Sequence, residues 1–166
     1  SQGSSFINNA SGNIQVNNVN FNWWSRAIVL VSASFTNQGM ISIGNLTLCS
    51  MGIGIEGTSS FVNGTSGGIQ INHITYNGII IFNPTSSFSN HGSITIGSTD
   101  TIGEAGIHAY DGGLFNNGST GVIQVNRANP NWWSKGIRVA SSAVFNNSGL
   151  IQLGNLTTNT IGLGVE

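Results

Sequence analysis

The acidic side chains of this sequence are the first candidates for acid–base chemistry or cation binding, and there are five of them among 166 residues. Their densest grouping also contains an imidazole and a phenol: Asp100, Glu104, His108, Tyr110 and Asp111. Such groups can transfer protons. Calcium, however, needs several converging oxygen ligands, and the Gly- and Asp-rich nonapeptide repeats that supply them are absent. We therefore expect these to be solvated turn residues rather than a site.

The other reactive residue types form no recognisable constellation. The histidines His73, His91 and His108 fall at different points of the repeat described below, which disfavours a metal site. The single cysteine, Cys49, has no disulfide partner and lies in an apolar stretch typical of a buried thiol. The sequence also lacks a Ser–His–acid arrangement, a phosphate-binding loop and a dinucleotide fingerprint. We predict that the chain is not an enzyme, with no catalytic residue, no cofactor and no metal.

Two tryptophan pairs are the most suggestive feature for binding. Trp23 and Trp24 are preceded by Asn and followed by Ser and Arg, and Trp132 and Trp133 are preceded by Asn and followed by Ser and Lys. An outward indole can stack on a sugar ring while neighbouring amides bind the hydroxyls. The alternatives are packing of both indoles within their own loop, which we favour, and contact with an adjacent chain. Surface glycans therefore remain possible partners.

The low charge of the chain limits its partners. Charged residues make up 5% of the sequence and the formal net charge is −1, whereas about 25% is usual for globular proteins. A basic nucleic-acid surface and a polybasic membrane patch are thereby excluded. The longest apolar runs are also too short to cross a bilayer as a helix. We expect no nucleic-acid partner and no direct membrane insertion.

An internal repeat of about 27 residues must position all of these side chains. Phenylalanine recurs six times at nearly regular spacing, and each is followed two residues later by asparagine. A glycine and an apolar–polar–apolar triplet follow in every repeat, as in Gly68 and Ile69–Ile71, and then a third apolar segment, as in Ile79–Ile81. The phenylalanines are Phe6, Phe35, Phe61, Phe88, Phe115 and Phe145, and the asparagines are Asn8, Asn37, Asn63, Asn90, Asn117 and Asn147.

The alternation within these segments predicts strands with one buried face. Three short strands per repeat, joined by Gly- and Asn-rich corners, indicate an all-β parallel β-helix, or solenoid, of about six coils. Coils spaced ~4.8 Å apart would form a rod ~29 Å long. We expect the phenylalanines to form an interior column. Because a buried amide needs hydrogen-bond partners, we expect the asparagines to bond from coil to coil as a ladder.

A longer repeat is superimposed on the short one. Residues 1–57 read as the same unit as 110–166, at an offset of 109 to 110 residues. Glu56 and Glu166 are thus equivalent residues four coils apart, roughly 19 Å, which is too far for the 5–9.5 Å of a glycosidase pair. Neither end reads as a polar cap. The sequence predicts one solenoid segment over 1–166 that is an excerpt of a longer array or stacks end to end. The alternative is a capping helix or loop that lies outside these residues.

The pattern Phe-X-Asn, Gly, Ile-X-Ile, Gly-Ile-X-Val resembles the right-handed β-helix repeats of large secreted bacterial adhesins of the filamentous-haemagglutinin and autotransporter kind. The resemblance covers nearly the whole chain and implies a right-handed helix, an extracellular or cell-surface location, and a structural or adhesive role. We therefore expect a non-enzymatic segment of an extracellular filament or adhesin stalk that associates with itself.

Three other functions fit the same fold less well. One is a carbohydrate-binding module that uses the tryptophan loops, and another is a polysaccharide-cleaving enzyme that acts through Glu104. The third is an ice-binding solenoid, which would use the outward position of the second strand. Only one of the six residues there is the threonine that such surfaces favour: Gln15, Ser42, Gln70, Thr95, Gln124 and Gln152.

Overall fold

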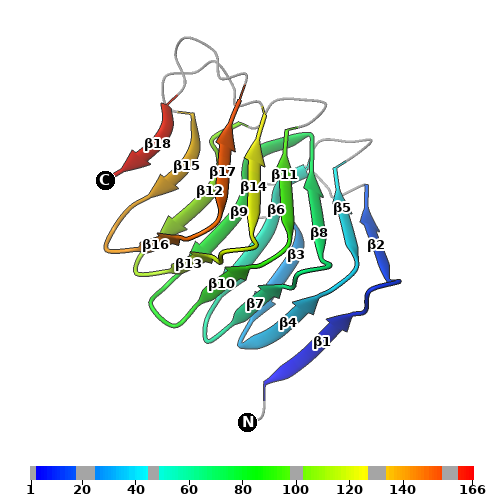
Figure 1. The fold of residues 1–166 in the computed structure, drawn as a ribbon. Coiled ribbons are helices and arrows are strands. Elements are labelled where there is room, and N and C mark those ends of the chain that lie inside the picture. The colour runs from blue at the N-terminus through cyan, green and yellow to red at the C-terminus, as the bar shows by residue number, and fades with distance from the viewer. Residues whose placement is uncertain (1–2, 18–24, 45–48, 98–102, 127–133, 155–160) are drawn as a thin grey trace.

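The strands of this protein form three parallel sheets. A computed structural model describes residues 3–17, 25–44, 49–97, 103–126, 134–154 and 161–166. Each sheet has six strands and takes one strand from every repeat (Figure 1). The chain winds as a parallel β-solenoid of about five turns with coils of about 27 residues, which confirms the predicted fold class.

Every third strand along the chain belongs to the same sheet. Sheet 1 contains β1 (Ser4–Asn8), β4 (Ala33–Asn37), β7 (Ser60–Asn63), β10 (Ser87–Asn90), β13 (Leu114–Asn117) and β16 (Val144–Asn147). Sheet 2 contains β2 (Asn13–Val16), β5 (Met40–Ile43), β8 (Gly68–Ile71), β11 (Ser93–Ile96), β14 (Val122–Val125) and β17 (Leu150–Leu153). Sheet 3 contains β3 (Arg26–Val31), β6 (Cys49–Glu56), β9 (Ile74–Phe82), β12 (Ala105–Tyr110), β15 (Lys135–Val139) and β18 (Ile161–Val165).

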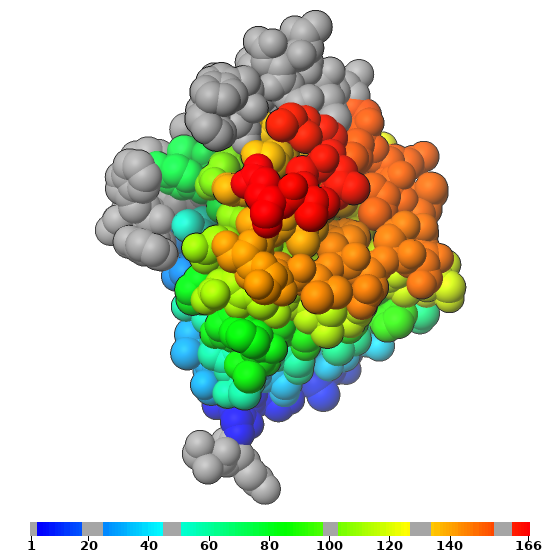
Figure 2. Space-filling view, turned by 90° about the vertical axis from the view of Figure 1, so that its left-hand side faces the viewer, coloured from blue at the N-terminus to red at the C-terminus, as the bar shows by residue number. Residues whose placement is uncertain are grey.

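The core is a tube enclosed by the three sheets. Alternate residues of each strand point inward, so isoleucines such as Ile69, Ile79 and Ile94 are at most 2% exposed. The register pairs equivalent residues of neighbouring repeats; for example, Ile94 lies beside Ile69 and Ile123. Seen from the C-terminal end, the coils lie on one another as successive colour bands (Figure 2). The inward side chains of each coil are therefore buried partly by the coils on either side.

Two ladders of identical side chains run through sheet 1. The six phenylalanine rings stack with centroids 4.7–4.9 Å apart. Beside them, each asparagine Nδ2 donates to the Oδ1 of the asparagine in the next coil, at 2.8 Å in all five steps. The predicted asparagine ladder is confirmed. Each repeat thus carries the same apolar and the same polar contact to its neighbour.

A glycine at the corner between sheets 1 and 2 lets the asparagine ladder reach the backbone. Gly39 packs so closely on the previous coil that a Cβ would lie 2.2 Å from the carbonyl oxygen of Gly12. In the third repeat this position belongs to Gly67, whose Cβ would meet the side chain of Asn63. Gly68, the glycine that the sequence pattern selects there, is instead the first residue of β8 and pairs with Met40.

The outward row of sheet 2 is aligned as the repeat predicts, because Gln70 pairs with Ser42 on one side and Thr95 on the other. In the part of the chain that the structure describes, no helix is long and apolar enough to span a membrane.

Candidate functional site on the outer face of sheet 3

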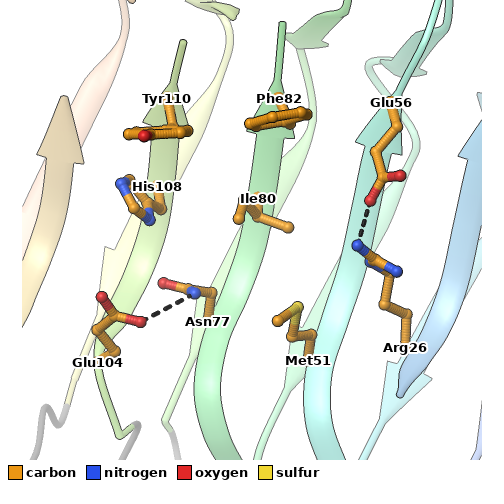
Figure 3. A pocket seen from close by; sticks show the side chains of 9 residues that line it. All are labelled: Arg26, Met51, Glu56, Asn77, Ile80, Phe82, Glu104, His108 and Tyr110. Atoms are coloured by element: carbon orange, nitrogen blue, oxygen red, sulfur yellow. Dashed lines mark hydrogen bonds and ion pairs between the residues drawn. The ribbon is translucent and has the colours of Figure 1, made fainter. Parts of the chain in front are cut away.

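A hollow on the described surface lies on the outer face of sheet 3. It has a volume of about 620 Å³ and crosses four adjacent strands, from β3 to β12 (Figure 3). Isoleucines such as Ile79 and Ile107 turn into the core, and the residues that follow them, Ile80 and His108, form the floor of this groove. Its lining consists of Arg26, Met51, Glu56, Asn77, Ile80, Phe82, Glu104, His108 and Tyr110.

An ion pair between coils closes one end of the groove. Arg26 of β3 binds Glu56 at the end of β6 through its guanidinium group. The aliphatic part of Arg26 crosses Gly54, where a Cβ would lie 2.4 Å from the arginine Cδ. Only a glycine at position 54 leaves room for the Arg26 side chain to reach Glu56 in this way. The ion pair therefore needs both Gly54 and Glu56.

The same arrangement returns four coils later. Lys135 of β15 binds Glu166 at 2.7 Å, and a Cβ on Gly164 would lie 2.6 Å from the lysine Cδ. The long repeat in the sequence therefore corresponds to a repeated ion pair in the structure. Since the partners lie in neighbouring coils, each ion pair also fixes how one coil sits on the next.

Glu104 occupies the opposite end of the groove in a second charged cluster. Its carboxylate accepts a hydrogen bond from Asn77 Nδ2 at 3.3 Å and another from Arg138 Nη1 at 3.0 Å. Arg138 also donates to Glu166 at 2.8 Å. Hydrogen bonds from Lys135 and then Arg138 lower the pKa of the Glu166 carboxyl below its usual value. Glu56, Glu104 and Glu166 are thus each paired with at least one cationic side chain.

His108 is a buried imidazole whose hydrogen-bonding atoms are not used. It is 6% exposed, and neither ring nitrogen has a hydrogen-bond partner among the described residues. Burial, followed by the positive charge of Arg138, lowers the pKa of His108 to about 4. At neutral pH the ring is therefore uncharged and offers one N–H donor and one acceptor nitrogen. Asn77, which is 3% exposed, has an Oδ1 atom that accepts no hydrogen bond from the part of the chain that the structure describes.

Two aromatic rings form the wall above His108 and Ile80. The rings of Phe82 and Tyr110 are nearly parallel, with an interplanar angle of 13° and centroids 5.6 Å apart. Figure 3 shows both rings nearly edge-on and side by side at the end of their strands. Both side chains are 37% exposed. The groove thus combines an aromatic wall, an apolar floor and a few polar groups.

The structure separates the acidic cluster that the sequence suggested. Glu104, His108 and Tyr110 do lie together in the groove, so the expectation that they are solvated turn residues is wrong for the buried His108. Asp111 does lie at a corner, where its backbone adopts a left-handed conformation with φ of 50°. Asp100 lies outside the described residues.

The other candidate residues are spread over the solenoid. His73 is in the corner after β8, where its Nδ1 lies 3.0 Å from the Gly44 carbonyl oxygen, and His91 is exposed directly after β10. In the described ranges no three His, Cys, Asp or Glu side chains converge as a metal site would require. Cys49 begins β6. Trp23, Trp24, Trp132 and Trp133 lie outside the described residues, so their glycan or assembly contacts stay predictions.

Several residues of the groove were not predicted from the sequence to belong to a site. Met51, Asn77 and Phe82 read as ordinary strand residues, because nothing in the spacing distinguishes a polar or aromatic side chain on an outer face. One signal was available: Arg26 and Lys135 recur with Gly-X-Glu in the following coil. A cation and an acid that repeat together across adjacent coils indicate an ion pair.

Acid is expected to destabilise the fold through His108. Its pKa is about 4 in the folded protein, against an ordinary value of 6.5, so the unfolded chain takes up this proton at a higher pH than the folded chain. The contribution of His108 to stability is complete above pH 6.5 and is lost as the pH falls toward 4. Urea unfolding across this range should show a falling free energy, and the fall should be smaller in His108→Phe. Identical pH profiles for the two proteins would contradict this assignment.

In comparisons with known proteins, no family model matches the sequence, and no curated protein and no solved structure shows significant similarity to the chain.

Proposed function

We propose that this chain is a non-enzymatic structural segment of an extracellular filament or adhesin stalk, where its coils form part of a stiff rod and its main partner is more of the same solenoid. The observation that carries the proposal is the register between equivalent residues of neighbouring coils, which holds in all three sheets apart from one shift near the start of β6 in sheet 3. Phe88, for example, pairs with Phe61 and Phe115, while Ile94 pairs with Ile69 and Ile123. Further coils can be added in this register, because each new coil makes the same contacts with its neighbour as the existing coils do.

The contacts between coils support a mechanical role. Each step from one coil to the next combines three parallel strand pairs, a phenylalanine stack and an asparagine–asparagine hydrogen bond. Bending the rod would stretch these contacts together on one side, so a stiff response is expected. The low charge of the chain also permits close packing of rods, because little electrostatic repulsion has to be overcome.

The state of the glutamates supports a role without catalysis. A carboxyl group that acts as a general acid at neutral pH needs a raised pKa. Glu166 instead has a lowered pKa, and Glu56 and Glu104 are bound to arginines. If polysaccharide cleavage through Glu104 were the function, purified protein would release reducing ends and Glu104→Gln would not. We expect no release from either protein.

The length of the rod tests the structural proposal. Inserting a second copy of residues 56–165 between Val165 and Glu166 adds one long repeat and joins Val165 to Glu56, which occupies the position of Glu166 in that repeat. Four coils at ~4.8 Å per coil should then be added, so electron microscopy or small-angle scattering should show rods longer by about 19 Å. Inserting a stretch that is not a whole number of coils serves as the control, and should cause misfolding. A globular particle, or an unchanged length, would refute the rod.

The extracellular location has its own test. Antibodies raised against this segment should label intact cells that produce the protein, and protease added to those cells should remove the label. Labelling that appears only after the cells are opened would overturn the proposed location. The rod measurement would be unaffected by that outcome, so the two parts of the proposal can fail separately.

A further inference from the structure

We propose that the groove on the outer face of sheet 3 binds a neutral oligosaccharide, whose sugar chain lies across β3, β6, β9 and β12 along the solenoid axis. This site goes beyond the structural role and does not involve the tryptophan pairs. It rests on the juxtaposition of a paired aromatic wall, two buried polar side chains with unused hydrogen-bonding atoms, and charges that are already neutralised.

The dimensions of the groove suit an extended ligand. Its volume of about 620 Å³ falls within the range of ligand-binding sites. It spans three steps between adjacent strands, or about 14 Å at ~4.8 Å per step. Such a groove is longer than a single six-membered ring and runs across the strands rather than into the core. A linear chain of rings therefore fits it better than a compact molecule.

The aromatic wall provides a surface for a sugar ring. Phe82 and Tyr110 keep their ring planes within 13° of each other and remain partly exposed. The π faces carry partial negative charge. The C–H groups on one face of a pyranose carry partial positive charge and are apolar, so they can stack against such a wall. Ile80 and Met51 continue the apolar surface along the groove (Figure 3).

The unused polar atoms call for a ligand that both donates and accepts hydrogen bonds. Both nitrogens of His108 and the Oδ1 atom of Asn77 are buried without hydrogen-bond partners in the described structure. A buried polar atom without a hydrogen bond destabilises the folded protein, because it has given up its bond to water. A neutral imidazole and an amide each combine donor and acceptor, as sugar hydroxyls do. None of the three atoms is exposed to solvent in this structure, so the side chains of His108 and Asn77 must turn toward the groove before sugar hydroxyls can bind these atoms.

The charges around the groove favour a neutral ligand. At one end Glu56 is paired with Arg26, and at the other Glu104 is paired with Arg138. An anionic sugar would meet two carboxylates whose charge is only just balanced, and a cationic ligand would have to displace an arginine. Neutral hydroxyls can bind the outer lone pairs of these carboxylates without disturbing either ion pair.

Calorimetric titration and amide NMR spectra with defined oligosaccharides test the proposal. The neutral probes are cellohexaose, chitohexaose, xylohexaose, maltohexaose and laminarihexaose, and the anionic probes are hexagalacturonate and a heparin hexasaccharide. We expect saturable binding of at least one neutral probe, with shifts confined to β3, β6, β9, β12 and the side-chain amide of Asn77. Failure of every neutral probe, or preference for an anionic probe, would overturn the proposal.

Substitutions in the groove locate the site. Tyr110→Ala removes a partly exposed ring and should leave the fold intact, yet weaken binding about tenfold. His108→Phe should weaken binding similarly, whereas His91→Ala, which changes an exposed histidine on another face, should have no effect. Unchanged affinity in Tyr110→Ala and His108→Phe would overturn the site. So would binding that is lost in Trp24→Ala or Trp133→Ala but kept in both groove variants.

Discussion

Replacing Asn90 by leucine is expected to lower the free energy of unfolding by about 4 kcal/mol. Asn90 Oδ1 accepts a hydrogen bond from Asn63, and its Nδ2 donates to Asn117, each at 2.8 Å. Its Nδ2 also contacts the carbonyl oxygen of Gly92 at 3.2 Å. Leucine makes none of these bonds, and its branched end is placed among polar atoms at a position that is fully buried. The buried partner atoms left behind account for most of the expected loss.

The matched control is the same substitution at the end of the ladder. Asn147 accepts from Asn117 and donates to Gly149, but it is exposed and has no described asparagine beyond it. Asn147→Leu should therefore cost much less than Asn90→Leu, since water can replace the lost partners. Chemical denaturation of both variants measures the difference. Equal losses at the two positions would mean that the ladder acts as separate hydrogen bonds rather than as a connected buried row.

The interior of this protein was predictable because identical residues stack on one another. Because every repeat has a phenylalanine and an asparagine at the positions of Phe61 and Asn63, stacking the coils places each side chain beside the identical side chain of the next coil. The register of the strands follows from this and does not depend on the loops. The prediction of the corner glycine was wrong in the third repeat, where the structure has Gly67 in place of Gly68. Two adjacent glycines satisfy the same spacing there. Only the close approach of the Gly67 corner to Asn63 decides between them.

The outer face was less predictable because it is not constrained by self-stacking. Val29, Gly54, Ile80, His108, Arg138 and Gly164 occupy one outward row, and only the two glycines, which are one long repeat apart, are alike. This row does not follow the repeat of about 27 residues, so its chemistry emerges only when the coils are assembled. The burial of His108 depends on these unlike neighbours, and the repeat itself contains no sign of it.

The difference between the two faces also separates the functions proposed for them. The interior repeats the same contact at every coil, as a rod requires. The groove is built from the residues that break the repeat: Phe82, His108 and Tyr110 occur in the coils that lie between the two Gly-X-Glu ion pairs. In a longer array, each long repeat would then present one such groove, spaced about 19 Å apart by four coils of ~4.8 Å. A filament of that kind could bind one glycan chain at several points, and its avidity would rise with length.

Gly92→Ala is expected to be as damaging as the loss of the asparagine, at about 4 kcal/mol, although it adds only one methyl group. The new Cβ would lie 2.2 Å from the carbonyl oxygen of Gly67 and 2.4 Å from that of Gly64. Both atoms belong to the backbone of the adjacent coil, so neither can rotate away. The coils must separate locally, which also stretches the hydrogen bonds of Asn63 and Asn90 beside the corner.

Gly154→Ala is the control that isolates this cause. A Cβ at Gly154 meets no atom of the described residues within 4 Å, and its backbone is not left-handed. Alanine there should be neutral or stabilise the protein by up to ~1 kcal/mol, because it restricts the unfolded chain. If thermal and chemical denaturation showed the two alanines to be equally tolerated, the corner would have to be looser than a 2.2 Å approach allows. The asparagine ladder would then need no glycine, and the recurrence of glycine after every Phe-X-Asn would need another explanation than contact between coils.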